Sequence, residues 1–147
     1  MPFSRRHIKI NNSQDIGGFT LEIQSLILEF AQALGGINKH KRDFWILEVP
    51  MAEEKTVTVF FQLNREESGE AFLVFFTQLG SYTQGDALDI ERLLRVNLDL
   101  RFSRTALMGE RVVLLAAAGE NFTEDILLEM VQEVVYAGNR LQQEFSG

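Results

Sequence analysis

Three segments with the composition of β-strands follow one another between residues 43 and 79. They read DFWILEV (43–49), TVTVFFQL (56–63) and AFLVFFTQL (71–79), and all are rich in branched and aromatic residues. The connections between them are short. Short connections join antiparallel neighbours, because a parallel crossover needs about a dozen residues or more. The sequence therefore predicts an antiparallel sheet at the centre of the fold.

The last two of these segments differ in how their apolar residues alternate. In 56–63, Val57, Val59 and Phe61 share one face and polar residues occupy most of the other, which predicts one buried face. The segment 71–79 is apolar on both faces, which predicts a central strand covered on both sides. If helices cover only one of those sides, the other is a surface for contact with a protein.

Helical spacing appears three times around these strands. Apolar residues recur at steps of three and four from Phe19 to Leu34, over a shorter stretch near 90–98, and over 120–145. Residues 38–42, NKHKR, are expected to form a basic loop. Two further strands are predicted near 101–108 and 111–118, joined by a tight turn at Gly109.

The predicted element order is α-β-β-β-α-β-β-α. Strands that come in runs favour an α+β domain. We expect a mainly antiparallel five-stranded sheet with two long helices packed on it and a short middle helix. Residues 1–17 are predicted to be a polar leader, and residues 18–147 a single α+β domain.

Composition argues against several classes of function. The chain has no cysteine, and its two histidines, His7 and His40, lack metal-ligand spacing, so no catalytic site, metal or cofactor is predicted. The net charge of −7 disfavours binding to nucleic acid. No apolar run approaches the length of a membrane span, so we expect a cytoplasmic protein that binds no membrane.

Basic residues nevertheless gather in two places. Residues 92–111 hold five arginines, which could pair with the protein's own acids, with a partner, or with a small ligand: Arg92, Arg95, Arg101, Arg104 and Arg111. The leader and the 39–42 loop could form one basic patch, and a nucleic-acid binder is the hypothesis that this patch raises.

The second half of the chain resembles the type III secretion chaperone fold and its relatives. The resemblance rests on LLRVNLDL (93–100) as a middle helix, RFSRTALMGERVVLLAAAG (101–119) as a hairpin, and FTEDILLEMVQEVVYAGNRL (122–141) as a long closing helix. The relatives include the YbjN-like sensory transduction regulators and related bacterial families of unknown function. As a pattern of elements, the resemblance extends over about residues 19–145.

This resemblance implies a non-enzymatic protein-binding or regulatory protein, in which a homodimer holds a client or regulatory protein on apolar sheet and middle-helix surfaces. The positions that it implies for contact with a second subunit or partner are Leu94, Asn97, Leu98, Phe102, Arg104 and Ala106. We expect Arg104 to lie at a subunit contact, paired with an acid or a backbone carbonyl. The alternative is a small-ligand-binding domain or enzyme that uses the arginine cluster at 92–111.

Overall fold

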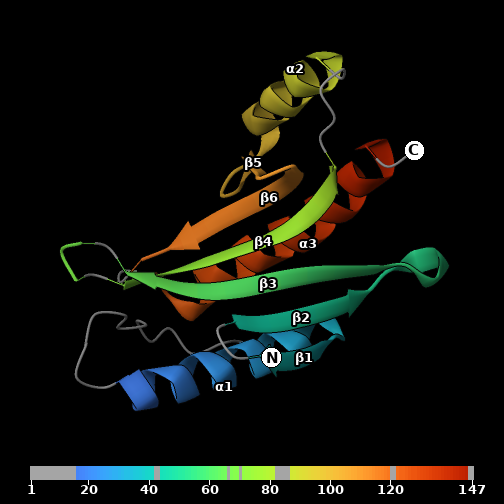
Figure 1. Cartoon of the computed structure of the whole chain (residues 1–147). Coiled ribbons are helices and arrows are strands. Elements are labelled where there is room, and N and C mark those ends of the chain that lie inside the picture. Colours follow the sequence, from blue (N-terminus) through green and yellow to red (C-terminus); the bar gives the residue numbers. More distant parts are fainter. Residues whose placement is uncertain are drawn as a thin grey trace.

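A computed structural model describes residues 16–41, 44–65, 67–69, 71–81, 87–119 and 122–145. These residues form an α+β fold with three α-helices and one antiparallel sheet of six strands (Figure 1). The helices are α1 (Ile16–Leu34), α2 (Ala87–Val96) and α3 (Glu124–Phe145), with short 3-10 turns η1 (Ala52–Glu54) and η2 (Asn97–Asp99). The strands are β1 (Ile37–Lys41), β2 (Phe44–Pro50), β3 (Thr56–Arg65), β4 (Ala71–Ser81), β5 (Arg104–Met108) and β6 (Arg111–Ala118).

The strands lie in the order β1-β2-β3-β4-β6-β5, and all neighbours are antiparallel. The predicted α+β class and mainly antiparallel sheet are confirmed, but the strand number is wrong, because the sheet has six strands and not five. The missed strand is β1, whose residues INKHK fall in the expected basic loop. Its polar residues have low strand propensity, and β1 forms because it sits at the edge of the sheet, where charged side chains reach solvent.

Helices α1 and α3 pack on the same face of the sheet. The main core joins apolar side chains of both helices to alternate residues of the strands, and Phe30, Phe61 and Phe75 are its largest fully buried members. In Figure 1, α3 passes behind β3 and β4. None of the helices in the described ranges covers the opposite face, so β4 is central as predicted but is covered on one side only.

Close contact between α3 and β4 depends on a glycine. A Cβ atom at Gly138 would lie 2.6 Å from the Cγ2 atom of Thr77, which is itself buried. One turn later, Gln142 donates a hydrogen bond of 2.7 Å to the carbonyl of Gln78, where the register of β4 shifts before Gly80. The side chain of Gln142 therefore satisfies a carbonyl beside the irregularity in the strand.

Helix α2 packs mainly against β5, and its Leu93 joins Leu141 of α3 and Leu100 in a small second core. Figure 1 shows α2 standing beyond β5, set apart from the layer that α3 forms behind the sheet. A helix placed this way leaves much of its surface uncovered. Within the described residues, no helix is long and apolar enough to cross a membrane.

Candidate functional site

The candidate site is the surface formed by α2, η2 and β5, which we call the α2–β5 surface. Leu94 lies on α2, Asn97 and Leu98 begin η2, and Arg104 and Ala106 lie on β5. A groove of about 130 Å³ between the helix and the strand is lined by Leu93, Leu94, Thr105, Ala106 and Leu107. The structure therefore brings Leu94 and Ala106 together in one groove of the same chain.

Four large apolar side chains are exposed on the α2–β5 surface. Leu94 is 63% exposed, Leu98 87%, Leu107 54% and Met108 43%. They make up half of the eight exposed large apolar side chains among the described residues. By contrast Leu93, the residue before Leu94 on the same helix, is 6% exposed. The apolar part of α2 is therefore only partly buried within the chain.

A polar joint fixes α2 to β5. The Oδ1 atom of Asn97 accepts a hydrogen bond of 2.8 Å from the backbone N–H of Thr105, and the Thr105 hydroxyl donates to the carbonyl of Leu93 at 2.8 Å. The side chain of Asn97, just after α2, thus satisfies a backbone N–H group of the neighbouring strand. The joint holds the exposed leucines at a set position relative to the strand.

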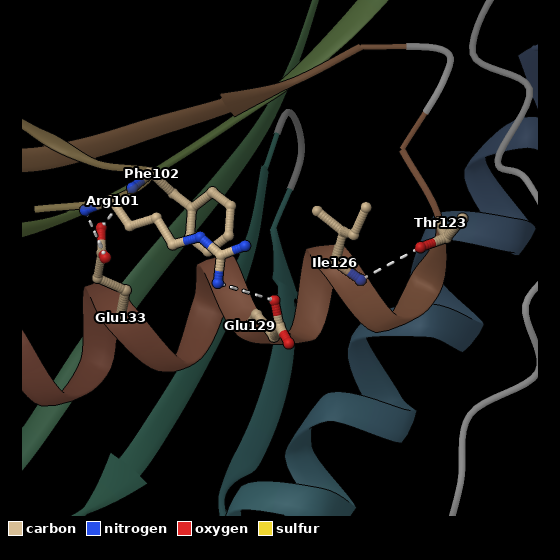
Figure 2. Close-up of polar contacts among 6 residues, drawn as sticks. All are labelled: Arg101, Phe102, Thr123, Ile126, Glu129 and Glu133. Carbon is tan, nitrogen blue, oxygen red and sulfur yellow. Dashed lines mark hydrogen bonds and ion pairs between the residues drawn. The ribbon is translucent and has the colours of Figure 1, made fainter.

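A second joint ties the segment before β5 to α3. The carboxylate of Glu133 accepts hydrogen bonds from the successive backbone N–H groups of Arg101, Phe102 and Ser103, at 2.9, 2.9 and 2.7 Å. It also accepts one from the Ser103 hydroxyl at 2.5 Å. Figure 2 shows the carboxylate pointing from α3 toward this segment. Consecutive N–H groups that point at one anion form a cradle, and here the chain fills the cradle itself.

The pKa of Glu133 reflects this environment. Burial raises the pKa, but the hydrogen bonds from the Ser103 hydroxyl and from the three backbone N–H groups lower it, and the net effect is below the ordinary value of 4.5. Glu133 is therefore ionised at neutral pH and acts as a fixed acceptor. Since all its partners belong to backbone groups or to Ser103, its role is to hold the segment in place.

Phe102 lies apart from the other five predicted contact residues. It precedes β5, is half-buried, and packs against the main core on the helix-covered side. The strand was expected to begin near residue 101, which would put Phe102 on the same face as Arg104 and Ala106. It begins instead at Arg104, because Glu133 takes the backbone N–H groups of the three preceding residues.

Arg104 donates hydrogen bonds to two carbonyls of its own chain, at 2.6 Å to Ser103 and 3.5 Å to Leu100. The expected carbonyl partner is therefore present within the subunit. The side chain is exposed on the face of the sheet that no described helix covers, beside Leu115 of β6. A contact between Arg104 and a second subunit stays a prediction.

The other arginines of the 92–111 cluster also have partners in the chain. Their pairs, in sequence order, are Arg92 with Glu144 at 3.5 Å, Arg95 with Glu91 at 2.6 Å, Arg101 with Glu129 at 3.8 Å, and Arg111 with Gln78 at 2.7 Å. Figure 2 shows Arg101 reaching along α3 toward Glu129, and its guanidinium lies 4.7 Å from the centre of the Phe102 ring. Arg92, Arg95 and Arg101 thus pair with the protein's own acids, whereas Arg104 and Arg111 bind neutral oxygens of the chain.

Beside Arg101, an open groove of about 440 Å³ runs between α3 and the segment 99–102. Its lining mixes charges of both signs, including Asp99, Glu129 and Arg140, with the ring of Tyr136. The groove is not enclosed, and the arginine beside it is already paired. The ligand-binding hypothesis thus loses the free arginines that motivated it.

Catalytic or metal-binding groups do not converge anywhere in the described ranges. No group of three or more His, Cys, Asp or Glu residues there could hold a metal ion. His40 is exposed and stacks on Trp45, with ring centres 5.1 Å apart. His7 lies outside the described residues, as does Arg42 of the basic patch, while Lys39 of that patch pairs with Glu48.

Sequence reasoning missed Glu133, Thr105, Leu107 and Met108. The sequence did not distinguish Glu133, because its helix carries four other acidic residues: Glu124, Asp125, Glu129 and Glu144. Leu107 and Met108 could have been recognised from the sequence. Residues next to a hairpin turn are usually polar, whereas here two large apolar residues precede Gly109. No protein-family model matches this sequence, and comparison with curated protein sequences finds no match.

Proposed function

We propose that this is a non-enzymatic protein-binding or regulatory protein that acts as a homodimer through the α2–β5 surface and binds its partner on the apolar face of the sheet. The observation that carries the proposal is the group of four exposed apolar side chains, Leu94, Leu98, Leu107 and Met108. Apolar side chains gathered in one region of a surface are typical of a protein contact.

The placement of the residues supports a contact between two copies. Exposed Leu94 lies on α2 and exposed Leu98 on the adjoining turn η2, and Glu91 and Arg95, one turn apart on α2, carry opposite charges. Around a two-fold axis between two antiparallel copies of α2, the same surface meets itself, so Glu91 of one copy approaches Arg95 of the other. The surface is thus complementary to itself in charge as well as in its apolar character.

The fold class supports the proposed relationship to secretion-chaperone-like proteins. That resemblance implies an α+β domain with a mainly antiparallel sheet and a middle helix between two groups of strands, and the chain has these features together with one additional edge strand. The internally paired arginines agree with a role in which this segment makes contacts and performs no chemistry.

Gel filtration with light scattering tests the homodimer. We expect twice the mass of 16.8 kDa at micromolar concentration, and half that value for a variant carrying Leu94→Ser and Leu98→Ser. The matched control is Leu28→Ser, which removes a leucine that is 46% exposed on α1 and should leave the dimer intact. A wild-type protein that is monomeric throughout this range contradicts the proposal.

A further inference from the structure

One row of side chains crosses all six strands on the face that the described helices leave uncovered. The register pairs Lys39 of β1 with Ile46, Ile46 with Phe60, Phe60 with Phe76, Phe76 with Leu115, and Leu115 with Arg104 of β5. Four apolar side chains therefore stand in line between two cations. Paired residues of antiparallel strands point to the same side of the sheet, so all six project from this face.

The aromatic members of this face contact one another directly. The rings of Phe60 and Phe76 stack with their centres 5.3 Å apart, and Phe44 meets Phe60 edge-on at 6.0 Å. Ile46 is buried, and Phe60, Phe76 and Leu115 are half-buried on a face that no described helix covers. We call Ile46, Phe60, Phe76 and Leu115 the apolar band. The contacts between its rings are already made within the chain, so a partner can bind the band without rearranging them.

The charges of the face have the opposite sign to those of the whole chain. Among its described side chains, Lys39, Arg104 and Arg111 are basic and Glu48 is the acid, whereas the net charge of the protein is −7. Lys39 uses one donor on Glu48, at 3.1 Å, and its ammonium group has two more. The cations at the two ends of the row are thus able to receive carboxylates from outside.

The dimensions of the row fit a helix. With about 4.8 Å between strands, the apolar part from Ile46 to Leu115 spans about 14 Å, and the two cations stand about 24 Å apart. A helix rises about 1.5 Å per residue, so about three turns cover the apolar part and about 16 residues separate the cations.

We propose that the uncovered sheet face binds an amphipathic helix of a partner protein, laid across the strands, with its apolar stripe on Phe60, Phe76 and Leu115, beside the buried Ile46, and its acidic ends at Lys39 and Arg104. This inference specifies which kind of partner binds the sheet in the proposed function. It rests on the proposed protein binding and does not depend on the homodimer. The chain's own N-terminal segment, with Arg5, Arg6 and Lys9, has the wrong charge for this position.

Charge and packing also favour a protein helix over single-stranded nucleic acid. A base-stacking platform presents free ring faces beside cations that track a phosphate backbone. Here Phe60 and Phe76 already stack on each other, aliphatic Ile46 and Leu115 flank them, and the cations stand only at the ends of the row.

The test uses a labelled helical peptide of about 17 residues, which matches the row in length, with leucines on one face and two glutamates at each end. Fluorescence anisotropy with the full-length protein should show binding at least tenfold tighter than for the same peptide with lysines at its ends. The difference should shrink several-fold between about 0.05 and 0.5 M salt, because salt screens the ion pairs at the ends. Equal binding of the two peptides overturns the proposal, and so does stronger binding of a single-stranded oligonucleotide.

Charge reversal on the protein gives the sharper test. The variant Lys39→Glu/Arg104→Glu should prefer the lysine-ended peptide, whereas Lys55→Glu/Arg140→Glu, which changes the same charges on exposed side chains outside the row, should keep the wild-type preference. A preference that is unchanged in the first variant, or reversed in the second, contradicts the assignment.

Removal of the apolar band should weaken both peptides. The variant Phe60→Thr/Phe76→Thr introduces threonine, which is favoured in strands, and circular dichroism checks that it folds. If it does not fold, the single variant Leu115→Thr is used in its place. We expect at least a tenfold loss of binding, and unchanged binding overturns the proposal. Light scattering on the same samples tests the two proposals separately. A monomer that binds the acidic peptide contradicts only the homodimer. A dimer that does not bind the peptide contradicts only the helix site.

Discussion

Glu133 accepts two hydrogen bonds from Ser103, one from its backbone N–H at 2.7 Å and one from its hydroxyl at 2.5 Å. With the N–H groups of the two preceding residues, they bring four donors to one side chain of α3. This contact joins the long helix to the segment that leads from α2 into β5. The position of the α2–β5 surface therefore depends on a residue outside it.

Replacement of Glu133 by glutamine should lower the free energy of unfolding by about 1–2 kcal/mol, because a neutral amide is a weaker acceptor and its NH₂ group faces N–H donors. Urea denaturation followed by circular dichroism measures the change. The control is Glu129→Gln, one turn earlier on α3, which removes only an exposed ion pair of 3.8 Å with Arg101 and should cost less than about 0.5 kcal/mol. Equal effects of the two substitutions contradict the role of Glu133.

The same joint should make stability depend on pH. Because the pKa of Glu133 in the folded protein lies below its ordinary value of 4.5, the ionised carboxylate stabilises the fold fully above that value, and this contribution is lost as the pH falls toward the folded pKa. The difference in unfolding free energy between wild type and Glu133→Gln should be constant from pH 7 to pH 5 and shrink below pH 4.5. Denaturation curves at several pH values measure it, and a difference that grows on acidification contradicts this account.

Asn97→Ala should lower the free energy of unfolding by about 1 kcal/mol, because the backbone N–H of Thr105 loses its acceptor. Asn97→Asp keeps an oxygen at the same place and serves as the control, with a smaller loss. Denaturation by urea gives the two values. Hydrogen exchange should show faster exchange of the Thr105 amide in Asn97→Ala alone, and unchanged protection there shows that the joint does not depend on Asn97.

Gly138→Ala should destabilise the protein although alanine favours helices by about 1 kcal/mol, because the added methyl overlaps the Cγ2 atom of Thr77 and overpacking costs about 1–3 kcal/mol. Thr77→Ser removes that atom and keeps the hydroxyl. The double variant should therefore recover much of the loss, which a double-mutant cycle by thermal or urea unfolding measures. Effects that simply add contradict a direct contact between the two sites.

The sequence predicted the parts of the fold that apolar spacing controls. Val57, Val59 and Phe61 alternate as a half-buried strand should, and all three are buried beneath the helices. Strand β1 escaped prediction because its neighbour β2, and not the propensity of INKHK, makes it a strand. The Glu133 joint escaped for a related reason, since it links residues about 30 positions apart and leaves no local pattern.

The predicted contact positions Leu94, Asn97, Leu98, Arg104 and Ala106 lie on α2, η2 and β5, close to the predicted middle helix and adjoining strand. Their contact with a second subunit or partner stays a prediction. Phe102 was assigned to the face of Arg104 and Ala106 by counting alternation through a segment that precedes the strand, and it is half-buried against the main core. The sequence predicted an exposed apolar sheet face only if helices cover one side of β4. The sequence of β4 alone does not show which faces the helices cover.

The hydrogen bond between Asn97 and Thr105 also decides how the sheet ends. Strand β5 is its last strand, and an edge strand with free N–H groups is a template for further strands from other molecules. In this protein one of those groups already donates to a side chain of the preceding turn, and α2 stands over the edge beside it. At the opposite edge Lys39 places a charge on β1. The two edges thus resist strand-by-strand growth into fibres, and two molecules can meet through their side chains without risk of endless sheet extension.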